Sequence, residues 1–587
     1  MKSTAAPRAI SKRVVLLLVA LAMLPYANAL SAGFTFDDEP DIQKNPAITS
    51  GVDLARIVAA PFPPGTVYRP FAVLTFALNE RLAPGNTVAY HGVNVLLHAG
   101  VAVLVFVLAI RLFGSVRTAQ IAAVLFALHP VHTEAVTSLV GRTELLAALF
   151  GLGAILSVDR ADTTTHWPAR LSLYLLSLAS FSLALFSKES ALAVVPLILL
   201  FRIARRREPL VTGLLTQLGS LDWVPYALCA GVFLFFRSRV VGGLMVNTPT
   251  PLDNALAFVP WSIRVRSALG ILWDYFGLLN LPLVLAADYS CAQVPIINTW
   301  TAPRFVAGLA LVVVAGCVTV RDRRPAVTFA MAFPFVALSV TSNLLFPIGT
   351  IKAERLLYFP SVGWALLVAF GFDHLTRVQR YRPIIIGLLS ILVGAFAVRT
   401  WVRNWDWLDN ASLYRSMVRS APDSAKSHYN MGVAFQKEGD DAAAIAEFRR
   451  ALEIYPFSDG ASAPLGIGVA SEKQGRMKEA IEWYKKALDL WPEFGKAHTN
   501  LCRALLIEEQ FDEAATACRR GLRYSPSDAN LLKGLGVSLV GAGNVEKGIA
   551  VLRRSLLLNE QDEELRTRLA QLESVSARSG QREVVPR

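Results

Sequence analysis

Residues that could do chemistry gather in a few short segments between apolar runs. The first is acidic, with Asp37, Asp38, Glu39 and Asp41 directly after Phe36. Carboxylates this close repel one another, which raises the pKa of at least one of them unless cations compensate. Such a carboxylate suits a general base that removes the proton of an acceptor hydroxyl. The alternative interpretation is a solvated acidic turn.

A second segment combines imidazoles with a carboxylate. His129 and His132 are three residues apart, Glu134 follows, and Arg142 lies further along. Two histidines and a glutamate could ligate a metal, but the spacing is not HExxH, and closing a four-coordinate site would need ligands from elsewhere. We therefore expect a hydrogen-bonding cluster and name no metal ligand, while a divalent metal stays open as a cofactor.

Basic residues supply the opposite charge. Lys188 and Glu189 interrupt two apolar runs without room for a loop. They are either paired with each other or functional, since an unpaired Lys at that depth costs on the order of 3 kcal/mol. Further along, Lys352 and Arg355 could hold a phosphate leaving group, because a guanidinium binds phosphate in a bidentate way. The alternative for these two is snorkelling at the membrane interface.

The elements that must position these residues are membrane helices. Of 587 residues, 53% are hydrophobic and only 18% charged, against roughly 25% charged in soluble proteins. Eleven apolar runs are candidate spans: the run after Arg13 and those near 91–110, 119–133, 143–158, 171–187, 189–201, 222–240, 303–320, 326–346, 357–374 and 383–400.

Two apolar segments are ambiguous. The first run could be a cleaved signal peptide, since Ala27-Asn28-Ala29 fits a cleavage site. The segment from Leu269 to Leu285 would, if counted as a span, place the Arg321 cluster outside, so we interpret it as re-entrant or interfacial.

Charge orients the eleven spans. The arginine clusters around Arg111, Arg202, Arg321 and Arg377 fall inside if the spans alternate, as the positive-inside rule asks. The acidic segment, the His-Glu cluster, Lys188 and Arg355 then meet on the outer side. From Ser420 onward the chain holds 23 Lys and Arg against 24 Asp and Glu. The net charge of +13 therefore lies among the spans, which argues against a nucleic-acid partner and favours membrane lipids.

The C-terminal part repeats. Pro456, Pro492 and Pro526 are 36 and 34 residues apart, and a period near 34 indicates tetratricopeptide repeats, helix pairs that must stack to bury their apolar stripes. We predict a membrane domain over 1–405 with a catalytic outer loop at 31–88, four repeats over 420–560, and a capping helix with a disordered tail over 561–587. The repeats could grip an extended peptide, although their aromatic residues suit inter-helix packing as well.

The five cysteines carry little information in sequence. They are odd in number and lack metal-ligand spacing: Cys229, Cys291, Cys317, Cys502 and Cys518. We therefore predict neither a disulfide framework nor a zinc site.

In combination, these motifs resemble the transmembrane and tetratricopeptide-repeat O-mannosyltransferases and their bacterial relatives, a branch of the GT-C glycosyltransferases. The resemblance runs from about residue 34 to 559. It is carried by the trailing repeats and by Asp37-Asp38 with Asn45-Pro46, Tyr68-Arg69-Pro70, His91-Gly92-Val93-Asn94 with His98, His129 to Val136, Gly141-Arg142, Ser187-Lys188-Glu189 and Glu354 to Tyr358.

The resemblance implies an all-α fold, a multispanning GT-C type membrane domain followed by a repeat solenoid. It also implies an inverting transfer of a hexose, with mannose expected, from a polyprenyl-phosphate sugar to Ser or Thr of an exported protein. Asp37 or Asp38 would be the catalytic base. The donor-phosphate or acceptor region would be lined by Arg69, His129, His132, Glu134, Arg142, Lys188, Glu189, Arg355 and Tyr358.

Four repeats are few for the eukaryotic members of that family. We therefore expect a bacterial inner-membrane protein with periplasmic repeats, or lumenal repeats in an endoplasmic reticulum membrane if the source is eukaryotic. The alternative function is a non-enzymatic membrane-anchored repeat scaffold for envelope assembly, although eleven spans are more than an anchor needs.

Overall fold

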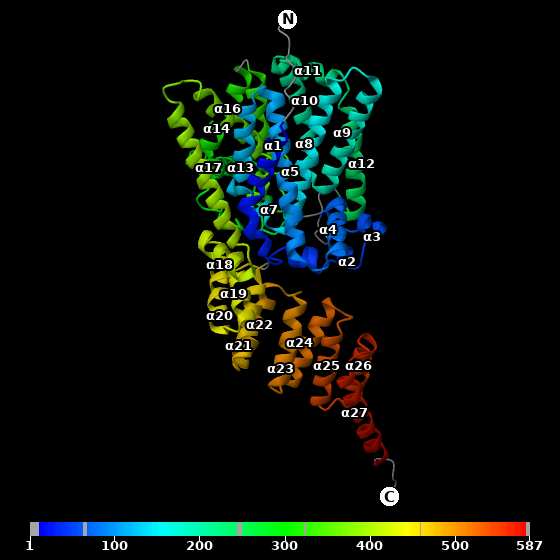
Figure 1. Cartoon of the computed structure of the whole chain (residues 1–587). Coiled ribbons are helices and arrows are strands. Elements are labelled where there is room, and N and C mark those ends of the chain that lie inside the picture. The colour runs from blue at the N-terminus through cyan, green and yellow to red at the C-terminus, as the bar shows by residue number, and fades with distance from the viewer. Residues whose placement is uncertain are drawn as a thin grey trace. The chain divides into compact units, whose positions relative to one another are not determined.

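The protein is seen in a computed structural model that describes residues 11–62, 67–243, 249–290, 292–321, 324–457 and 460–582. Across these residues every regular element is a helix, which confirms the predicted all-α class. The helices form two compact units, Met1–Ala421 and Pro422–Arg587 (Figure 1). Each unit has its own buried apolar core.

Seven helical segments among the described residues are long and apolar enough to cross a membrane. The longest, α5, has 27 residues and at 1.5 Å per residue extends roughly 40 Å, more than the hydrocarbon core of about 30 Å. The seven are α1 with the 3-10 turn after it (Lys12–Ser31), α5 (Thr87–Phe113), α8 (Arg142–Asp162) with the turn before it from Leu139, α9 (Trp167–Ser187), α12 (Val224–Val241), α14 (Pro303–Arg321) and α17 (Arg382–Trp405).

The other four apolar runs fold into shorter helices of 13 to 15 residues: α6 (Val116–Leu128), α10 (Val194–Arg206), α15 (Pro325–Leu338) and α16 (Ser361–Leu375). The number of eleven spans therefore stays a prediction. The ambiguous segment from Leu269 forms the second half of α13 (Trp261–Asn280), which carries Arg266 and Asp274. The remaining helices of this unit are α2 (Pro46–Thr49), α3 (Leu54–Ala59), α4 (Pro70–Leu82), α7 (Thr133–Val136), α11 (Leu210–Gly219) and α18 (Asn410–Ser420).

Small residues allow the helices of this unit to approach closely. A Cβ atom added to Gly308 of α14 would lie 1.9 Å from the carbonyl oxygen of Leu269 in α13. A Cβ atom on Gly363 of α16 would lie 2.8 Å from the carbonyl oxygen of Ala330 in α15. Close backbone approach at small residues is typical of membrane helices, which gain little from the hydrophobic effect within lipid.

Arginines of three of the clusters in the sequence bind buried aspartates in this unit. Two buried aspartates join them: Asp159 binds Arg111 at 2.5 Å and Arg205 at 2.8 Å, and Asp373 binds Arg377 at 3.1 Å and approaches Arg117 to 3.9 Å. Figure 1 shows α2, α3 and α4 of the acidic loop at the end of the unit opposite to α11. Of the predicted basic residues, Arg323 lies outside the described residues.

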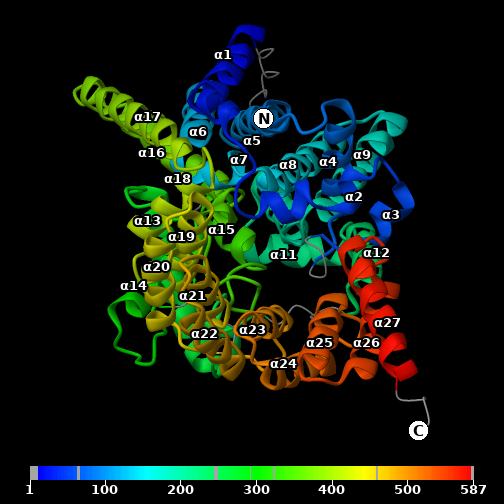
Figure 2. The same cartoon turned by 90° about the horizontal axis from the view of Figure 1, so that it is seen from below.

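The C-terminal unit is built of helix pairs that follow one another in chain order (Figure 2). Its described helices are α19 (Ala425–Glu438), α20 (Asp441–Ile454), α21 (Ser462–Lys473), α22 (Met477–Leu490), α23 (Gly495–Ile507), α24 (Phe511–Tyr524), α25 (Ala529–Gly541), α26 (Val545–Leu558) and α27 (Glu563–Arg582). The end of the predicted tail, 583–587, lies outside the described residues.

One prediction about this unit is wrong. Cys502 of α23 and Cys518 of α24 form a disulfide, where the odd number of cysteines led us to expect none. Counting cysteines over the whole chain hides the pair, because Cys229 and Cys317 are free and belong to the other unit. Cys291 lies outside the described residues.

Candidate functional site

The acidic loop is held by a strained residue and a buried one. Phe36 has a φ of 51°, a left-handed conformation that costs on the order of 1 kcal/mol outside glycine, and its N–H donates to Asn410 at 2.8 Å. Asp38 is fully buried, and its carboxylate accepts the N–H groups of Thr35 at 3.1 Å and Val140 at 2.9 Å. Burial raises the pKa of Asp38 to about 7, although these N–H groups oppose the rise. Asp38 therefore ties the loop to the turn before α8.

Asp37 differs from its neighbour because its side chain is only half-buried. Its charge acts on Asp41, whose pKa is raised to about 7, first by burial and then by Asp37. The charge of Asp37 also acts on Arg355. The partly accessible carboxylate of Asp37 therefore lies within electrostatic range of an arginine that is far along the chain.

Two ion pairs flank this point. Arg69 binds Glu189 in a bidentate way, with Nε to Oε2 at 3.1 Å and Nη2 to Oε1 at 2.8 Å. Lys188 pairs with Glu144, and both side chains are buried. Lys188 and Glu189 therefore pair with distant partners, which replaces the alternative of a self-paired hairpin.

A third ion pair completes the group. Arg355 pairs with Glu134, whose second carboxylate oxygen accepts the Arg355 N–H at 2.8 Å. The Arg355 side chain is still 32% exposed, whereas that of Glu134 is 2% exposed. Arg69 and Arg355 both act on the charge of Lys188. We call these residues the charge cluster: Asp37, Arg69, Glu134, Glu144, Lys188, Glu189 and Arg355.

Arg142, which the resemblance assigns to the donor or acceptor region, is engaged by the protein itself. It is fully buried, and it donates from Nε to Asn94 at 2.9 Å and from Nη2 to Asn79 at 3.0 Å. Its guanidinium lies 4.3 Å from the ring centroid of Phe76. These contacts give Arg142 a positioning role between α4, α5 and α8.

The histidines form the hydrogen-bonding cluster expected from the sequence. His129 Nε2 lies 2.9 Å from a backbone carbonyl oxygen of α13, and His132 Nε2 lies 2.8 Å from Ser361 Oγ. The Tyr358 hydroxyl lies 2.9 Å from His98 Nδ1. All of these side chains are buried. They join α5, the end of α6 and the start of α16.

A cavity of about 370 Å³ adjoins the segment that carries Arg355. Its polar wall contains Lys352, whose Nζ lies 3.4 Å from Asp274 and 4.5 Å above the Tyr289 ring, and Arg304, 3.7 Å from Asp274. Its other wall is apolar and well exposed: Trp273, Leu281, Leu283 and Val284. Lys352 is among the residues predicted from the sequence, whereas Asp274 is not, although a lone carboxylate in an apolar run was a signal.

Glu354 adjoins the cavity through Tyr289, which lines it. It is fully buried, and its Oε1 accepts the Tyr289 hydroxyl at 2.7 Å. Its Oε2 has no hydrogen-bond partner among the described residues. Burial raises the pKa of Glu354 to about 7, with Arg403 opposing the rise. An unpartnered buried acceptor of this kind is suited to a ligand hydroxyl.

The described parts of the chain contain no group of three or more His, Cys, Asp or Glu that could hold a metal ion.

Comparison with known proteins agrees with both units. Tetratricopeptide-repeat family models match residues 425–458, 457–493 and 505–572. Mouse Protein O-mannosyl-transferase TMTC3 is 30% identical over 490 residues, which cover 77% of this chain and 52% of that protein. Mouse Protein O-mannosyl-transferase TMTC4 is 31% identical, covering 73% of this chain and 65% of that protein. The chain thus spans about half to two thirds of these relatives.

A solved structure, YrrB, described as a tetratricopeptide-repeat protein with an unusual peptide-binding site, matches 33% of this chain and 95% of its own at 17% identity and a TM-score of 0.24.

The resemblance predicted from the motifs is confirmed at the level of homology: the chain is a homologue of the TMTC protein O-mannosyl-transferases, with apolar membrane-type helices followed by tetratricopeptide repeats.

Proposed function

We propose that this protein is a membrane glycosyltransferase that moves a hexose, with mannose as the first candidate, from a polyprenyl phosphate to a Ser or Thr hydroxyl of an exported protein. The observation that carries the proposal is that Asp37 is a half-buried carboxylate beside the fully engaged Asp38, while the guanidinium of Arg355 keeps 32% exposure in its ion pair with Glu134. The names of the relatives support the sugar and the reaction class.

The proposed step is a single displacement. The Asp37 carboxylate takes the proton of the acceptor hydroxyl while the hydroxyl oxygen bonds to the anomeric carbon of the sugar. The bond between that carbon and the phosphate oxygen breaks, and its electron pair leaves with the lipid phosphate. Direct displacement inverts the anomeric centre. Arg355, together with Lys352 on the same segment, stabilises the charge that gathers on the leaving group.

The cavity beside Lys352 suits the lipid donor. Lys352 and Arg304 offer cations for a phosphate, and the exposed side chains of Trp273 and Leu283 offer an apolar wall for the first units of a lipid chain. The free oxygen of Glu354 is an acceptor for a sugar hydroxyl. These features support a donor that is at once anionic, hydroxylated and apolar.

We assign the base to Asp37 and a positioning role to Asp38. Both oxygens of Asp38 accept backbone N–H groups, and its side chain is fully buried. A carboxylate used in this way holds the loop but cannot reach an acceptor hydroxyl. Asp37 is carried by the same loop and is partly accessible.

We further propose that the repeats bind the acceptor protein on the exported side of a bacterial inner membrane. Tetratricopeptide repeats commonly present an extended concave surface. The distribution of charge in the membrane unit, with arginine clusters at one end and the charge cluster toward the acidic loop, supports this orientation.

The deciding experiment compares three variants of the full-length protein in membranes, with labelled polyprenyl-phosphate mannose and an exported acceptor protein. Asp37→Asn is expected to lower the rate of transfer by about 100-fold or more, the usual contribution of a general base. Asp53→Asn is the matched control, because Asp53 is an exposed acid of the same loop that caps α3 and Asn caps helices equally well.

Asp38→Asn is expected to lower both transfer and thermal stability, since it disturbs the loop. If Asp37→Asn transfers sugar as fast as the Asp53→Asn control, Asp37 is not the base. If neither the wild type nor any variant transfers sugar or binds the donor, the non-enzymatic scaffold becomes the better account.

A further inference from the structure

The repeats of the C-terminal unit share one packing rule. In three of them, a large side chain of the second helix packs against a glycine 16 positions earlier in the first helix. A Cβ atom on that glycine would lie 2.5 to 2.7 Å from the large side chain, so the contact requires the glycine. The three pairs are Gly432 with Phe448, Gly468 with Tyr484, and Gly536 with Leu552.

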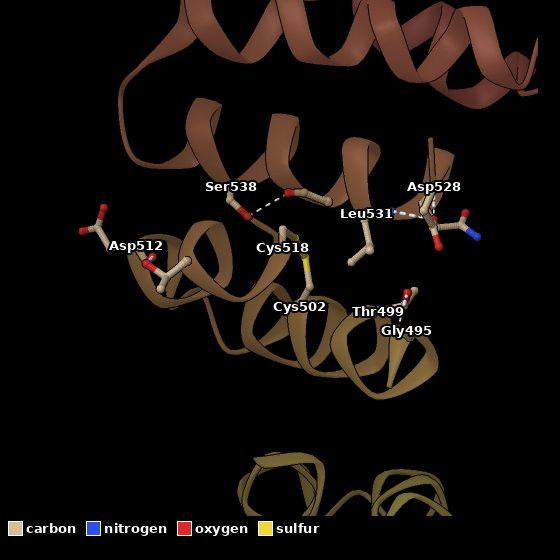
Figure 3. The surroundings of a disulfide bond; sticks show 11 residues. Gly495, Thr499, Cys502, Asp512, Cys518, Asp528, Leu531 and Ser538 are labelled. Atoms are coloured by element: carbon tan, nitrogen blue, oxygen red, sulfur yellow. Dashed lines mark hydrogen bonds between the residues drawn. A yellow bond between two sulfur atoms is a disulfide. The ribbon is translucent and has the colours of Figure 1, made fainter. Parts of the chain in front are cut away.

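The third repeat departs from this rule at both positions. Cys502 stands where the other repeats have glycine, and Cys518 stands where they have the large residue, with the same separation of 16. The two cysteines are bonded, their Cα atoms are 5.4 Å apart, and they are 2% and 0% exposed. That Cα separation lies within the range usual for disulfides. Figure 3 shows the bond between α23 and α24.

The fourth repeat packs against this disulfide in the same way as the second repeat packs against the Phe448 ring of the first. A Cβ atom on Gly534 of α25 would lie 2.5 Å from Cys502 Sγ and 3.0 Å from Cys518 Sγ. At the equivalent position two repeats earlier, a Cβ atom on Gly466 would lie 2.7 Å from the Phe448 ring. The disulfide therefore occupies the space between successive repeats that an aromatic ring occupies elsewhere.

We propose that Cys502–Cys518 is a structural disulfide that replaces the glycine–ring contact of the other repeats, and that it forms because the C-terminal unit matures in an oxidising compartment. The replacement needs both positions to change together, since one cysteine alone would leave either a glycine without its ring or a side chain in place of the glycine.

The oxidation defines the compartment. Two thiols lose two protons and two electrons as the S–S bond forms, and the electrons pass by thiol–disulfide exchange to the disulfide of an exported oxidoreductase, which is reduced to a dithiol. Such pairs persist outside the cytosol and are kept reduced within it. The bond thus indicates an exported C-terminal unit, from an observation that involves neither the membrane helices nor the transfer reaction.

The bond also makes the unit sensitive to reductant. After reduction, two small cysteine side chains remain at a contact that the other repeats fill with a large residue, so the native packing is poorer. The broken cross-link also no longer restrains the unfolded chain. Because each repeat is stabilised mainly by its neighbours, loosening the third also weakens the contact with the fourth.

The first test measures the bond in cells. In a full-length variant with Cys229, Cys291 and Cys317 replaced by alanine, thiols are blocked with N-ethylmaleimide before lysis. The denatured protein is then treated with a polyethylene-glycol maleimide, with and without prior reduction. The proposal expects two adducts after reduction and none without it. No adduct in either sample would mean that both thiols were free in the cell, and would overturn the proposal.

The second test measures what the bond does, with a variant that restores the pair of the second repeat, Cys502→Gly with Cys518→Tyr. Complete reduction of the wild type, verified by the same thiol count, is expected to raise the rate of proteolysis within the C-terminal unit on the order of 100-fold, as for opening a cross-linked loop of about 15 residues. The restored variant should be cut at one rate with or without reductant. Equal rates for oxidised and reduced wild type would remove the structural role.

Both readouts are independent of glycosyl transfer. A protein that carries the bond but transfers no sugar would leave this inference intact and contradict the proposed function. A protein that transfers sugar but lacks the bond would contradict this inference and leave the proposed function intact.

Discussion

Asp37 and Asp38 are adjacent in sequence, yet their surroundings give them different chemistry. Both carboxylate oxygens of Asp38 accept hydrogen bonds from backbone N–H groups. Asp37, in contrast, is partly accessible and interacts electrostatically with Arg355. Sequence patterns show that an acidic pair is present but cannot show which member is turned inward. Phe36, directly before the pair, takes a left-handed conformation that no local propensity favours.

A pH dependence of stability follows from Asp41. Its pKa is raised to about 7, first by burial and then by Asp37, with Arg69 opposing, against about 3.9 in an unfolded chain. Between these values the native state keeps a proton that the unfolded state loses, so the contribution of Asp41 to the free energy of unfolding is full below about pH 4 and is lost as the pH rises through 7.

Asp41→Asn removes this contribution. Thermal unfolding of the full-length protein in detergent at pH 5 and pH 8 should show a smaller drop in the variant than in the wild type, by roughly 1 to 2 kcal/mol. Part of the drop should remain, because the pKa of Asp38 is raised in the same direction. The Asp53→Asn control should keep the full wild-type drop. An identical drop in the wild type and Asp41→Asn would contradict the assignment.

At the scale of helices, the sequence predicted the elements better than their partners. Apolar runs and the period near 34 located the membrane helices and the repeats, because both signals repeat along the chain. The partners of Lys188, Arg69 and Lys352 could not be predicted, since each ion pair joins helices whose packing is decided by side-chain shape. The cysteine pair was missed for a related reason: its meaning appears only when the repeats are aligned.

The contact between α13 and α14 can be tested with two glycines of one helix. Gly308 faces the backbone of α13, whereas a Cβ atom on Gly316 would meet nothing within 4 Å. Gly308→Ala should force the helices apart and lower stability by about 2 to 4 kcal/mol, as expected for overpacking. Because α13 carries Asp274 of the cavity wall, donor binding should weaken too.

Gly316→Ala has the same change of composition without the clash, and alanine favours helix over glycine by up to about 1 kcal/mol. It should therefore leave thermal stability unchanged or slightly higher, with normal donor binding. If both variants unfold at the same temperature, α13 and α14 are not in the close contact on which the cavity wall depends.

At the scale of the whole molecule, the proposed reaction requires the acidic loop and the repeats to face the same compartment, opposite to the arginine clusters. This can be measured with single cysteines at exposed positions, in the variant that lacks Cys229, Cys291 and Cys317 but retains the bonded pair. Lys44→Cys reports on the acidic loop, Ser527→Cys on the repeats, and Thr165→Cys on the turn between α8 and α9, near Asp159 and Asp162.

In spheroplasts, a membrane-impermeant maleimide should label Lys44→Cys and Ser527→Cys at once, and Thr165→Cys only after permeabilisation. The reason is that the two ends of α8 differ. The acidic loop is tied to the turn before Arg142 at its start, whereas Asp159 binds Arg111 and Arg205 near its other end. At 24 residues with that turn, the segment spans roughly 36 Å, enough to separate two aqueous compartments. Labelling of Lys44→Cys and Ser527→Cys from opposite sides would make a repeat-bound acceptor unreachable by Asp37, and the proposed transfer would fail on geometry alone.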